Sequence, residues 1–219
     1  MPADLAVIVT ARNEGDRLGR TLRALRAAFP EAELWVADDA SQDDTSHVAL
    51  QEGAHLVRAP RRLGKGGAAT LAAQQVDAKA VVLADGDLGD SARELAKLVA
   101  ALDGADLTIA TFARRAGGGF GIAVKAARWA TERGGGPALN APLSGQRAIR
   151  GDALRSLLPF APGFGMETGM NIDAARAGLR MAEVELDLEH RATGKTARDF
   201  VHRGRQLADI VRAYASRRS

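Results

Sequence analysis

Two carboxylates separated by one glycine end an apolar run in the segment VVLADGDLGD, residues 81–90. The run predicts a buried strand that delivers Asp85 and Asp87 to the edge of a sheet. Carboxylates in such a place can hold a divalent cation, act as acid and base, or cap the helix expected from Ser91 onward. Gly86 would allow a turn that brings both carboxylates toward one ion, and the segment by itself leaves the three uses open.

Polar side chains also follow two other predicted strands. They are Thr10, Arg12, Asn13 and Glu14 after the first strand, and Asp38 and Asp39 after the second. In a parallel α/β sheet, ligands bind beyond the carboxyl ends of the strands, where the strand order reverses. Several acidic side chains at one rim repel each other unless positive charge lies among them. A divalent cation with a phosphate ligand, and basic residues nearby, would satisfy this rim.

The elements that position these residues alternate along the chain. Apolar runs predict strands at 5–11, 32–40, 54–60, 80–87 and 105–112, and helical spacing predicts helices between them at 15–29, 41–53, 66–78 and 91–104. Ser41 is the expected cap of the second helix and Gly53 its end. Further on, 122–131 and 171–179 are helix-like and 182–190 is strand-like. The alternation predicts a parallel sheet covered by helices on both faces, with right-handed crossovers.

Length and composition limit the classes of protein. A chain of 219 residues, 46% hydrophobic and 26% charged, predicts one domain over 1–219. There is no cysteine, which excludes disulfides and thiolate metal sites and favours a cytoplasmic protein. Neither a signal-type segment nor an apolar run of ~20 residues occurs, so we expect any membrane contact to be peripheral, at the inner face. A net charge of +3 does not indicate a nucleic-acid partner.

Basic residues gather in two segments, RRLGKGG at 61–67 and the stretch from His190 to the end of the chain. Both suit an anionic ligand. The alternative for the second segment is a solvated helix face with a polar tail. Leu207, Ile210, Val211 and Tyr214 fall at helical spacing there, so one side of the segment is expected to pack on the domain.

Several nucleotide and hydrolase signatures are missing. The first loop, TARNEGDRLG, contains neither the G-x-G-x-x-G of dinucleotide folds nor the G-x-x-x-x-G-K-[ST] of phosphate loops, and RLGKGGA lacks the first glycine of the latter. LSGQRA is not a G-x-S-x-G nucleophile elbow. These absences argue against dinucleotide chemistry, P-loop chemistry and acyl hydrolysis.

Four segments together resemble the family-2 glycosyltransferases of the GT-A fold: VIVTARNEGDRLGRTLRAL, WVADDASQDDT, RRLGKGGAA and VLADGDL. LSGQRAIR and GFGMETGMNIDAARAGL look like acceptor-side segments of the branch with polyprenyl-phosphate sugar transferases and glucosyl-3-phosphoglycerate synthases. The resemblance implies an α/β, Rossmann-like, mostly parallel central sheet with helices on both faces. It also implies a nucleotide-sugar-binding half at 1–112 and an acceptor-binding half at 113–219, which includes the basic C-terminal segment.

The resemblance assigns roles in binding the nucleotide sugar. Asp39 would accept a hydrogen bond from the uracil imide, Glu14 would approach the ribose, and Lys65 would lie near the base or the phosphates. The full expected set is Thr10, Arg12, Glu14, Asp39, Lys65, Asp85 and Gly86, with Arg12 at the position of the family's usual tyrosine. Structural alternatives stay open: Asp38 and Asp39 can form a turn with Ser41, and Glu14 can be a first-turn helix acid.

The resemblance also implies magnesium or manganese, bound by Asp87 most directly, with Asp85 and His190. The cation would stabilise negative charge on the nucleotide leaving group. Glu167, in GFGMETG, is the candidate catalytic residue beside Asp87, either as a general base for the acceptor or as a ligand of sugar hydroxyls. A helix N-terminal acid is the alternative for Glu167. The expected acceptor-binding residues are Ser144, Gly145, Arg147, Arg191 and Lys195, since a guanidinium matches phosphate geometry.

The function expected from these features is metal-dependent transfer of a hexose, with glucose as the first candidate, from a UDP-linked donor. The acceptor would be anionic, a phosphorylated small molecule or a polyprenyl phosphate. Two alternatives remain, a sugar-phosphate nucleotidyltransferase and a non-catalytic module that binds nucleotide sugars. The former lacks its glycine-rich signature after the first strand, and the intact Asp85 and Asp87 argue against the latter. A homodimer is compatible with the sequence.

Overall fold

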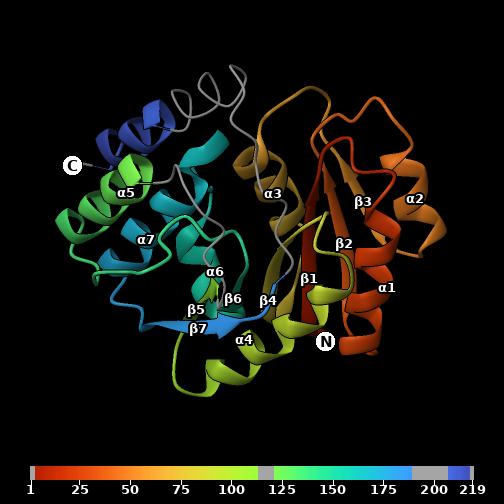
Figure 1. Ribbon diagram of the computed structural model, residues 1–219, viewed down its shortest axis with the longest axis horizontal. Helices are drawn as coiled ribbons and strands as arrows, with labels where there is room; N and C mark the ends of the chain where they lie inside the picture. Colours follow the sequence, from red (N-terminus) through yellow and green to blue (C-terminus); the bar gives the residue numbers. More distant parts are fainter. Residues whose placement is uncertain (1–2, 113–120, 189–206, 218–219) are drawn as a thin grey trace.

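The computed structural model describes residues 3–112, 121–188 and 207–217. Within these residues a seven-stranded mixed sheet runs through the molecule in the order β3-β2-β1-β4-β6-β5-β7 (Figure 1). The strands are β1 (Ala3–Ala11), β2 (Glu33–Asp38), β3 (His55–Arg58), β4 (Ala78–Asp85), β5 (Leu107–Phe112), β6 (Arg147–Arg150) and β7 (Met181–Leu186). The predicted alternation of strands and helices is confirmed over the first 112 residues.

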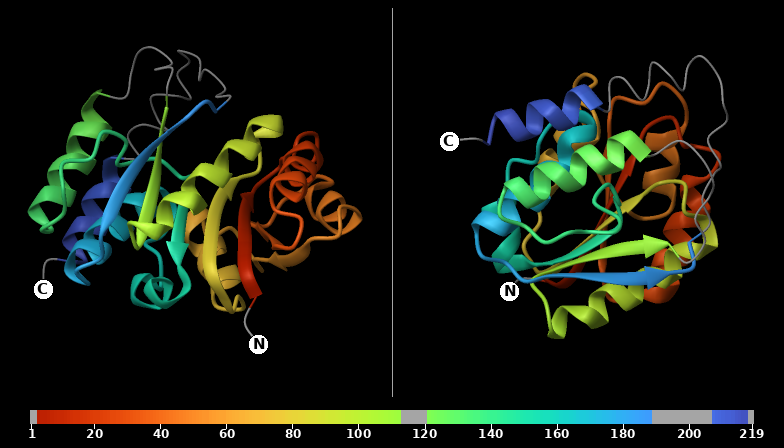
Figure 2. Two further views of the ribbon diagram at one scale, coloured as in Figure 1. Left: turned by 90° about the horizontal axis from the view of Figure 1, so that it is seen from below. Right: turned by 60° about the vertical axis from the view of Figure 1, so that its left-hand side comes forward.

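Helices cover both faces of this sheet. They are α1 (Leu18–Ala28), α2 (Thr45–Gln51), α3 (Lys65–Ala73), α4 (Ala96–Ala100), α5 (Gly121–Arg133), α6 (Gly151–Leu154) and α7 (Met166–Arg176), with 3-10 turns η1 (Gly89–Leu95), η2 (Ala101–Asp103), η3 (Arg155–Leu157) and η4 (Gly163–Gly165). Residues 207–215 form a further helix. Figure 2 shows α1 and α2 at one end of the molecule and α5 with the 207–215 helix at the other. None of the helices described here is both long and apolar enough to cross a membrane.

The alternation of side chains along the central strands produces two cores. On one face Val7 and Val9 pack with the leucines of α1, which recur at helical spacing as Leu18, Leu22 and Leu25. On the other face Ile8, Val81 and Leu83 pack against the alanines of α3 and against α6 and α7. Strands buried on both faces read as continuous apolar runs, as in LAVIV and VVLA.

One strand of the sheet was not predicted. β6 is antiparallel to both β4 and β5, so the sheet is mixed rather than wholly parallel. It has four residues, of which Ala148 and Ile149 are buried in opposite cores. A segment this short carries too little periodicity to be recognised by pattern.

Two helix expectations differ in detail. The helix predicted over 91–104 is divided into η1, α4 and η2. Ser41 does not cap α2, because the helix begins only after Asp44, and the Ser41 hydroxyl instead accepts the Asn13 N–H at 3.0 Å. Gly53 does end that helix, in the left-handed conformation at φ +69°.

The strand order reverses between β1 and β4. β1 pairs in parallel with β2 on one side and with β4 on the other, which aligns Ala11 with Asp38 and Thr10 with Asp85. The chain moves outward from β1 to β2 and β3, then returns to place β4 on the other side of β1. The carboxyl ends of these strands therefore meet at the switch point, where the sequence places the polar residues.

Candidate active site

The Asp85–Gly86–Asp87 turn is tied to the end of β1. The Gly86 N–H donates to the Thr10 carbonyl at 3.0 Å, and the Thr10 hydroxyl lies 3.3 Å from an oxygen of Asp85. The Thr21 hydroxyl of α1 donates to the Gly86 carbonyl at 2.8 Å. A Cβ on Gly86 would lie 3.3 Å from that of Ala11, so the turn fits closely against β1. Asp87, by contrast, is exposed.

Lys65 links the two halves of the site. Its ammonium lies 2.6 Å from Oδ1 of Asp85 and 3.1 Å from Oε1 of Glu167. Lys65 is the first residue of α3, Asp85 the last of β4, and Glu167 stands in the first turn of α7. The structure thus brings together the carboxylate expected on the donor side and the one expected on the acceptor side around one ammonium group.

Charge pairing outweighs burial in this cluster. Burial alone would lower the pKa of Lys65, but Asp85 and Glu167 raise it well above its usual value. Burial alone would likewise raise the pKa of Asp85, but Lys65, followed by the hydrogen bonds from Lys65, Gln146 and Thr10, lowers it. Lys65 and Asp85 therefore stay charged at neutral pH.

The SGQ segment at 144–146 closes the site from the β6 side. The Gln146 side-chain amide donates to Oδ2 of Asp85 at 2.6 Å, and the Ser144 hydroxyl donates to Oε1 of Gln146 at 3.4 Å. A Cβ on Gly145 would lie 2.1 Å from Nζ of Lys65, so a side chain here would collide with the ion pair. Gln146 was not predicted as a site residue, and the available signal was its place between Gly145 and Arg147, two expected site residues.

Asp39 organises the glycine loop that follows β3. Its carboxylate accepts the N–H groups of Leu63 at 2.6 Å and Gly64 at 3.0 Å, directly before α3 begins at Lys65. Arg12 donates to the Asp39 carbonyl at 2.9 Å. The structure therefore shows Asp39 holding the loop that carries Lys65, and the expected contact with uracil stays a prediction.

The alternative of a turn made with Ser41 applies to Asp38. This carboxylate is fully buried and accepts the Ser41 N–H at 2.8 Å and the Ser46 hydroxyl at 2.5 Å. Glu14 precedes α1, and its carbonyl accepts the N–H groups of Arg17 and Leu18 at the helix start. Its carboxylate lies 3.7 Å from Arg17.

Arg147 is the clearest correction to the expected site. Its side chain was expected to meet an anionic acceptor, but the residue is 0% exposed. The guanidinium donates to the carbonyls of Ser144 and Pro142 and, at 2.7 Å, to Oδ1 of Asn171. Burial lowers the pKa of Arg147 to about 10, against the opposing effect of Glu167. Arg147 therefore braces the β6 segment against α7 from inside the protein.

Three expected residues, His190, Arg191 and Lys195, lie outside the described residues. In the part of the chain that is described, no group of three or more His, Cys, Asp or Glu side chains is placed to hold a metal ion. Both oxygens of Asp85 already accept hydrogen bonds, from Lys65 and Gln146. A cation at this rim would accordingly depend on Asp87 and on oxygens from a substrate.

Comparison with known proteins decides the family. The profile of glycosyl transferase family 2 matches residues 6–152, which run from within β1 to just past β6 and include the whole Asp85–Asp87 turn. The chain belongs to glycosyl transferase family 2. It is thus a glycosyltransferase, and the resemblance drawn from the sequence motifs is confirmed.

Two relatives in the family align with 94% of this chain. An undecaprenyl-phosphate mannosyltransferase from Micrococcus luteus is 29% identical, with 91% of its length covered. A glucosyl-3-phosphoglycerate synthase from Mycolicibacterium paratuberculosis is 33% identical, with 68% of its length covered. The two relatives are named for different sugars and different acceptors.

Solved structures confirm the expected GT-A fold. Glucosyl-3-phosphoglycerate synthase from Mycobacterium tuberculosis, in complex with phosphoglyceric acid, superposes with a TM-score of 0.81 at 27% identity. The same enzyme with Mn²⁺, UDP and glucosyl-3-phosphoglycerate gives 0.80 at 28% identity. Each match covers 98% of this chain and 80% of the solved chain.

Proposed function

We propose that this glycosyltransferase transfers a hexose, with glucose as the first candidate, from a UDP-linked donor to a phosphorylated acceptor, using magnesium or manganese. The observation that carries the proposal is the exposed Asp87 at the switch point, next to the Lys65 bridge between Asp85 and Glu167. The solved relative that binds Mn²⁺ and UDP supports the donor and the metal. Membership of glycosyl transferase family 2 argues against the alternative that the protein is a sugar-phosphate nucleotidyltransferase.

The residues of the rim fit a divalent cation. Magnesium and manganese sites in such enzymes use one or two carboxylates plus substrate phosphate oxygens. Asp87 would hold the ion together with oxygens of the donor, and His190 is proposed as a further ligand. Asp85, which accepts hydrogen bonds from Lys65 and Gln146, would add negative charge next to the ion without being its main ligand. When bound, the cation would stabilise the negative charge that develops on the departing nucleotide.

The donor would lie along residues 1–112 and the acceptor along 113–219. Lys65 keeps positive charge between the two positions, and its ion pair holds the Glu167 carboxylate in a fixed direction. Glu167 would accept a hydrogen bond from a hydroxyl of the sugar or the acceptor. A phosphate acceptor arrives as an anion and needs no general base, in which case Glu167 orients the sugar. Arg191 and Lys195 are proposed to meet acceptor phosphates.

Calorimetry on Asp87→Asn tests this proposal. We expect the variant to bind UDP-glucose in the presence of manganese at least tenfold more weakly, since it loses about 1.5–3 kcal/mol of charged interaction. Its melting temperature should hardly change, because Asp87 is exposed. GDP-mannose serves as the alternative donor in the same measurement. Release of UDP from UDP-glucose in the presence of either 3-phosphoglycerate or a polyprenyl phosphate identifies the acceptor class.

Asp90→Asn is the matched control. Asp90 lies in η1, which follows the turn, and pairs with Arg20 at 2.5 Å on the surface, an interaction of small energy. Donor binding that is equal in the two variants would refute the metal role of Asp87. Donor binding without any turnover on either acceptor class would favour the non-catalytic module.

A further inference from the structure

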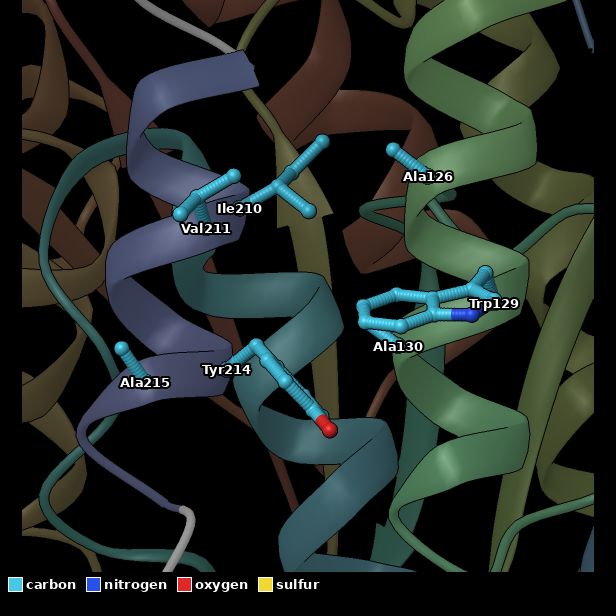
Figure 3. Close-up of a pocket in the computed structure, with 7 residues that line it drawn as sticks. All are labelled: Ala126, Trp129, Ala130, Ile210, Val211, Tyr214 and Ala215. Carbon is cyan, nitrogen blue, oxygen red and sulfur yellow. The ribbon is translucent and has the colours of Figure 1, made fainter.

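A groove of about 370 Å³ runs between α5 and the 207–215 helix (Figure 3). Figure 3 shows Ile210 and Tyr214 of the C-terminal helix pointing toward Ala126 and Trp129 of α5. Its walls are formed by Ala126, Trp129 and Ala130 from α5 and by Ile210, Val211 and Tyr214 from the C-terminal helix. Apart from the edges of Trp129 and Tyr214, these side chains are hydrocarbon.

Small and large side chains together shape the groove. The alanines of α5 leave space, while Trp129 and Tyr214 meet at its side with ring centroids 5.0 Å apart. Ile210 and Ala213 are buried beneath the helix and hold it on the domain. The helical spacing expected for this segment is thus confirmed, but Val211 points away from the core and is 57% exposed.

The exposed apolar side chains are concentrated on these two helices. Among the described residues, four large apolar side chains are strongly exposed. Three of them, Ile122, Trp129 and Val211, lie on α5 and the C-terminal helix, and the fourth, Leu50, lies on α2 at the opposite end of the molecule. A clustered apolar surface beside a groove indicates an interaction site.

Basic side chains border this surface. Ile122, Lys125, Trp129 and Arg133 recur at helical spacing on the exposed side of α5, and the Arg133 guanidinium lies 5.8 Å from the Trp129 ring. Arg212 is exposed next to Val211. The nearby acids are Glu132, which is exposed, and Asp209, which is already paired with Arg212 at 3.1 Å.

This combination fits the surface of an anionic bilayer better than a second copy of the chain. Tryptophan and aliphatic side chains bordered by lysine and arginine are typical of surfaces that lie at the lipid interface. A stable dimer interface involves about 20–30 residues of all kinds a side, and Ile122, Trp129 and Val211 would form only a small apolar part of one.

The surface is also connected to the candidate active site. Asp209 of the C-terminal helix accepts the Phe164 N–H at 3.2 Å, within the η4 turn. η4 leads directly into α7, which carries Glu167 in its first turn. A protein docked through this surface would hold the acceptor side of the site near the lipid headgroups.

We propose that α5 and the 207–215 helix dock the protein on an anionic lipid bilayer, with Trp129 and Val211 inserted among the lipids and Lys125, Arg133 and Arg212 near the headgroups. The docking follows from this surface alone. Its consequence for the acceptor, which would be a lipid phosphate presented at the bilayer, rests on the proposed function.

Sedimentation of the full chain with vesicles of phosphatidylcholine, with and without phosphatidylglycerol, tests the docking. We expect binding to the anionic vesicles that weakens as salt is raised. Trp129→Ala and Val211→Ser should each lower the partition coefficient about tenfold, because they remove inserted apolar surface. Lys125→Glu should also lower it about tenfold, through lost attraction and added repulsion.

Matched controls distinguish binding through this surface from non-specific adsorption of the protein to vesicles. Leu50→Ser removes an equally exposed apolar side chain from α2, and Arg155→Glu makes the same charge reversal at an exposed site on η3. Both should bind vesicles like the unsubstituted chain. Circular dichroism shows whether each variant is folded.

Three outcomes would overturn the docking: no binding of the unsubstituted chain to anionic vesicles, equal losses in Leu50→Ser and Val211→Ser, or a dimer in ultracentrifugation that Val211→Ser dissociates. Asp87→Asn should bind vesicles normally, since docking needs no donor. Failure of sugar transfer with intact vesicle binding would therefore count against the proposed function and not against the docking.

Discussion

Lys65 shows how one side chain connects the parts of the site. Its ammonium lies between the partly buried Asp85 and the buried Glu167, two carboxylates that would otherwise repel each other. The contact with Asp85 exists because position 145 has no side chain. Gly145 is therefore needed for the ion pair between Lys65 and Asp85 to form.

Replacing Gly145 by alanine should break this arrangement selectively. The new Cβ would lie 2.1 Å from Nζ of Lys65 and 3.1 Å from an Asp85 oxygen, so the ammonium must leave its present place beside Asp85. We expect little change in melting temperature and a loss of roughly tenfold or more in donor affinity, the scale of one charged hydrogen bond. Calorimetry with UDP-glucose and manganese measures it.

A double-mutant cycle provides the control. In a Lys65→Met background, Gly145→Ala should have almost no further effect on donor affinity, because the group it displaces is already absent. Additive losses in the cycle would mean that Gly145 acts through something other than Lys65.

At the scale of elements, α3 must approach its neighbours closely to bring Lys65 to Asp85. A Cβ on Gly66 would lie 1.9 Å from the carbonyl oxygen of Ala161, a backbone atom that cannot rotate away. We expect Gly66→Ala to lower the free energy of unfolding by about 3 kcal/mol, as overpacking does at rigid sites. Urea denaturation measures the change.

Gly104→Ala is the comparison for this effect. A Cβ there meets nothing within 4 Å, and the residue has φ −107°, which alanine adopts without strain. Its unfolding free energy should stay within about 0.5 kcal/mol of the unsubstituted chain. Equal losses in the two variants would contradict the close approach of α3.

The pair Asp106 and Arg180 joins the starts of β5 and β7. Arg180 donates from its backbone N–H and two guanidinium nitrogens to the Asp106 carboxylate, at 2.9, 3.1 and 3.0 Å. These hydrogen bonds lower the pKa of Asp106 to about 2. Because the folded pKa is depressed, the stabilisation is present above the unfolded value of about 3.9 and is lost as pH falls toward 2.

Asp106→Asn should therefore destabilise the protein at neutral pH but not in acid. The difference in unfolding free energy between the variant and the unsubstituted chain should be constant above pH ~5 and shrink between pH ~4 and 2. Denaturation at a series of pH values measures it, with Asp152→Asn as a surface control. A difference that persists unchanged at pH ~2 would show that the side-chain geometry, not the charge, matters.

At the scale of the whole molecule, donor binding should stabilise the fold by mass action. UDP-glucose at a hundred times its Kd, with manganese, adds about 2.7 kcal/mol to the free energy of unfolding. For a chain of this length that corresponds to a rise of about 5–10 °C in Tm. Thermal denaturation with and without EDTA checks both the donor and the metal.

The effect of EDTA shows whether the rise in Tm depends on the metal ion. With EDTA the rise should largely disappear, and adenosine diphosphate with manganese should produce much less of it. A shift of the same size in EDTA would mean that the nucleotide binds without a cation, contrary to the proposed role of Asp87.

The sequence alone determined the features that are local in the chain. Strands and helices of the first 112 residues were predictable because their apolar periodicity is carried by neighbouring residues. The Asp85–Gly86–Asp87 turn was recognisable for the same reason, since its chemistry and its position after an apolar run are both written in one segment. Placing it at the switch point needed only the rule for parallel α/β sheets.

Only the tertiary structure decided which distant residues meet. Lys65 contacts Glu167 because α3 and α7 begin at the same end of the sheet, and Gln146 reaches Asp85 because β6 inserts antiparallel beside β4. Arg147 looks like an acceptor ligand in sequence, yet its neighbours bury it completely. A contact between distant residues depends on the path of the whole chain, and the local periodicity of the sequence does not encode that path. Burial of a side chain depends on all the residues packed around it.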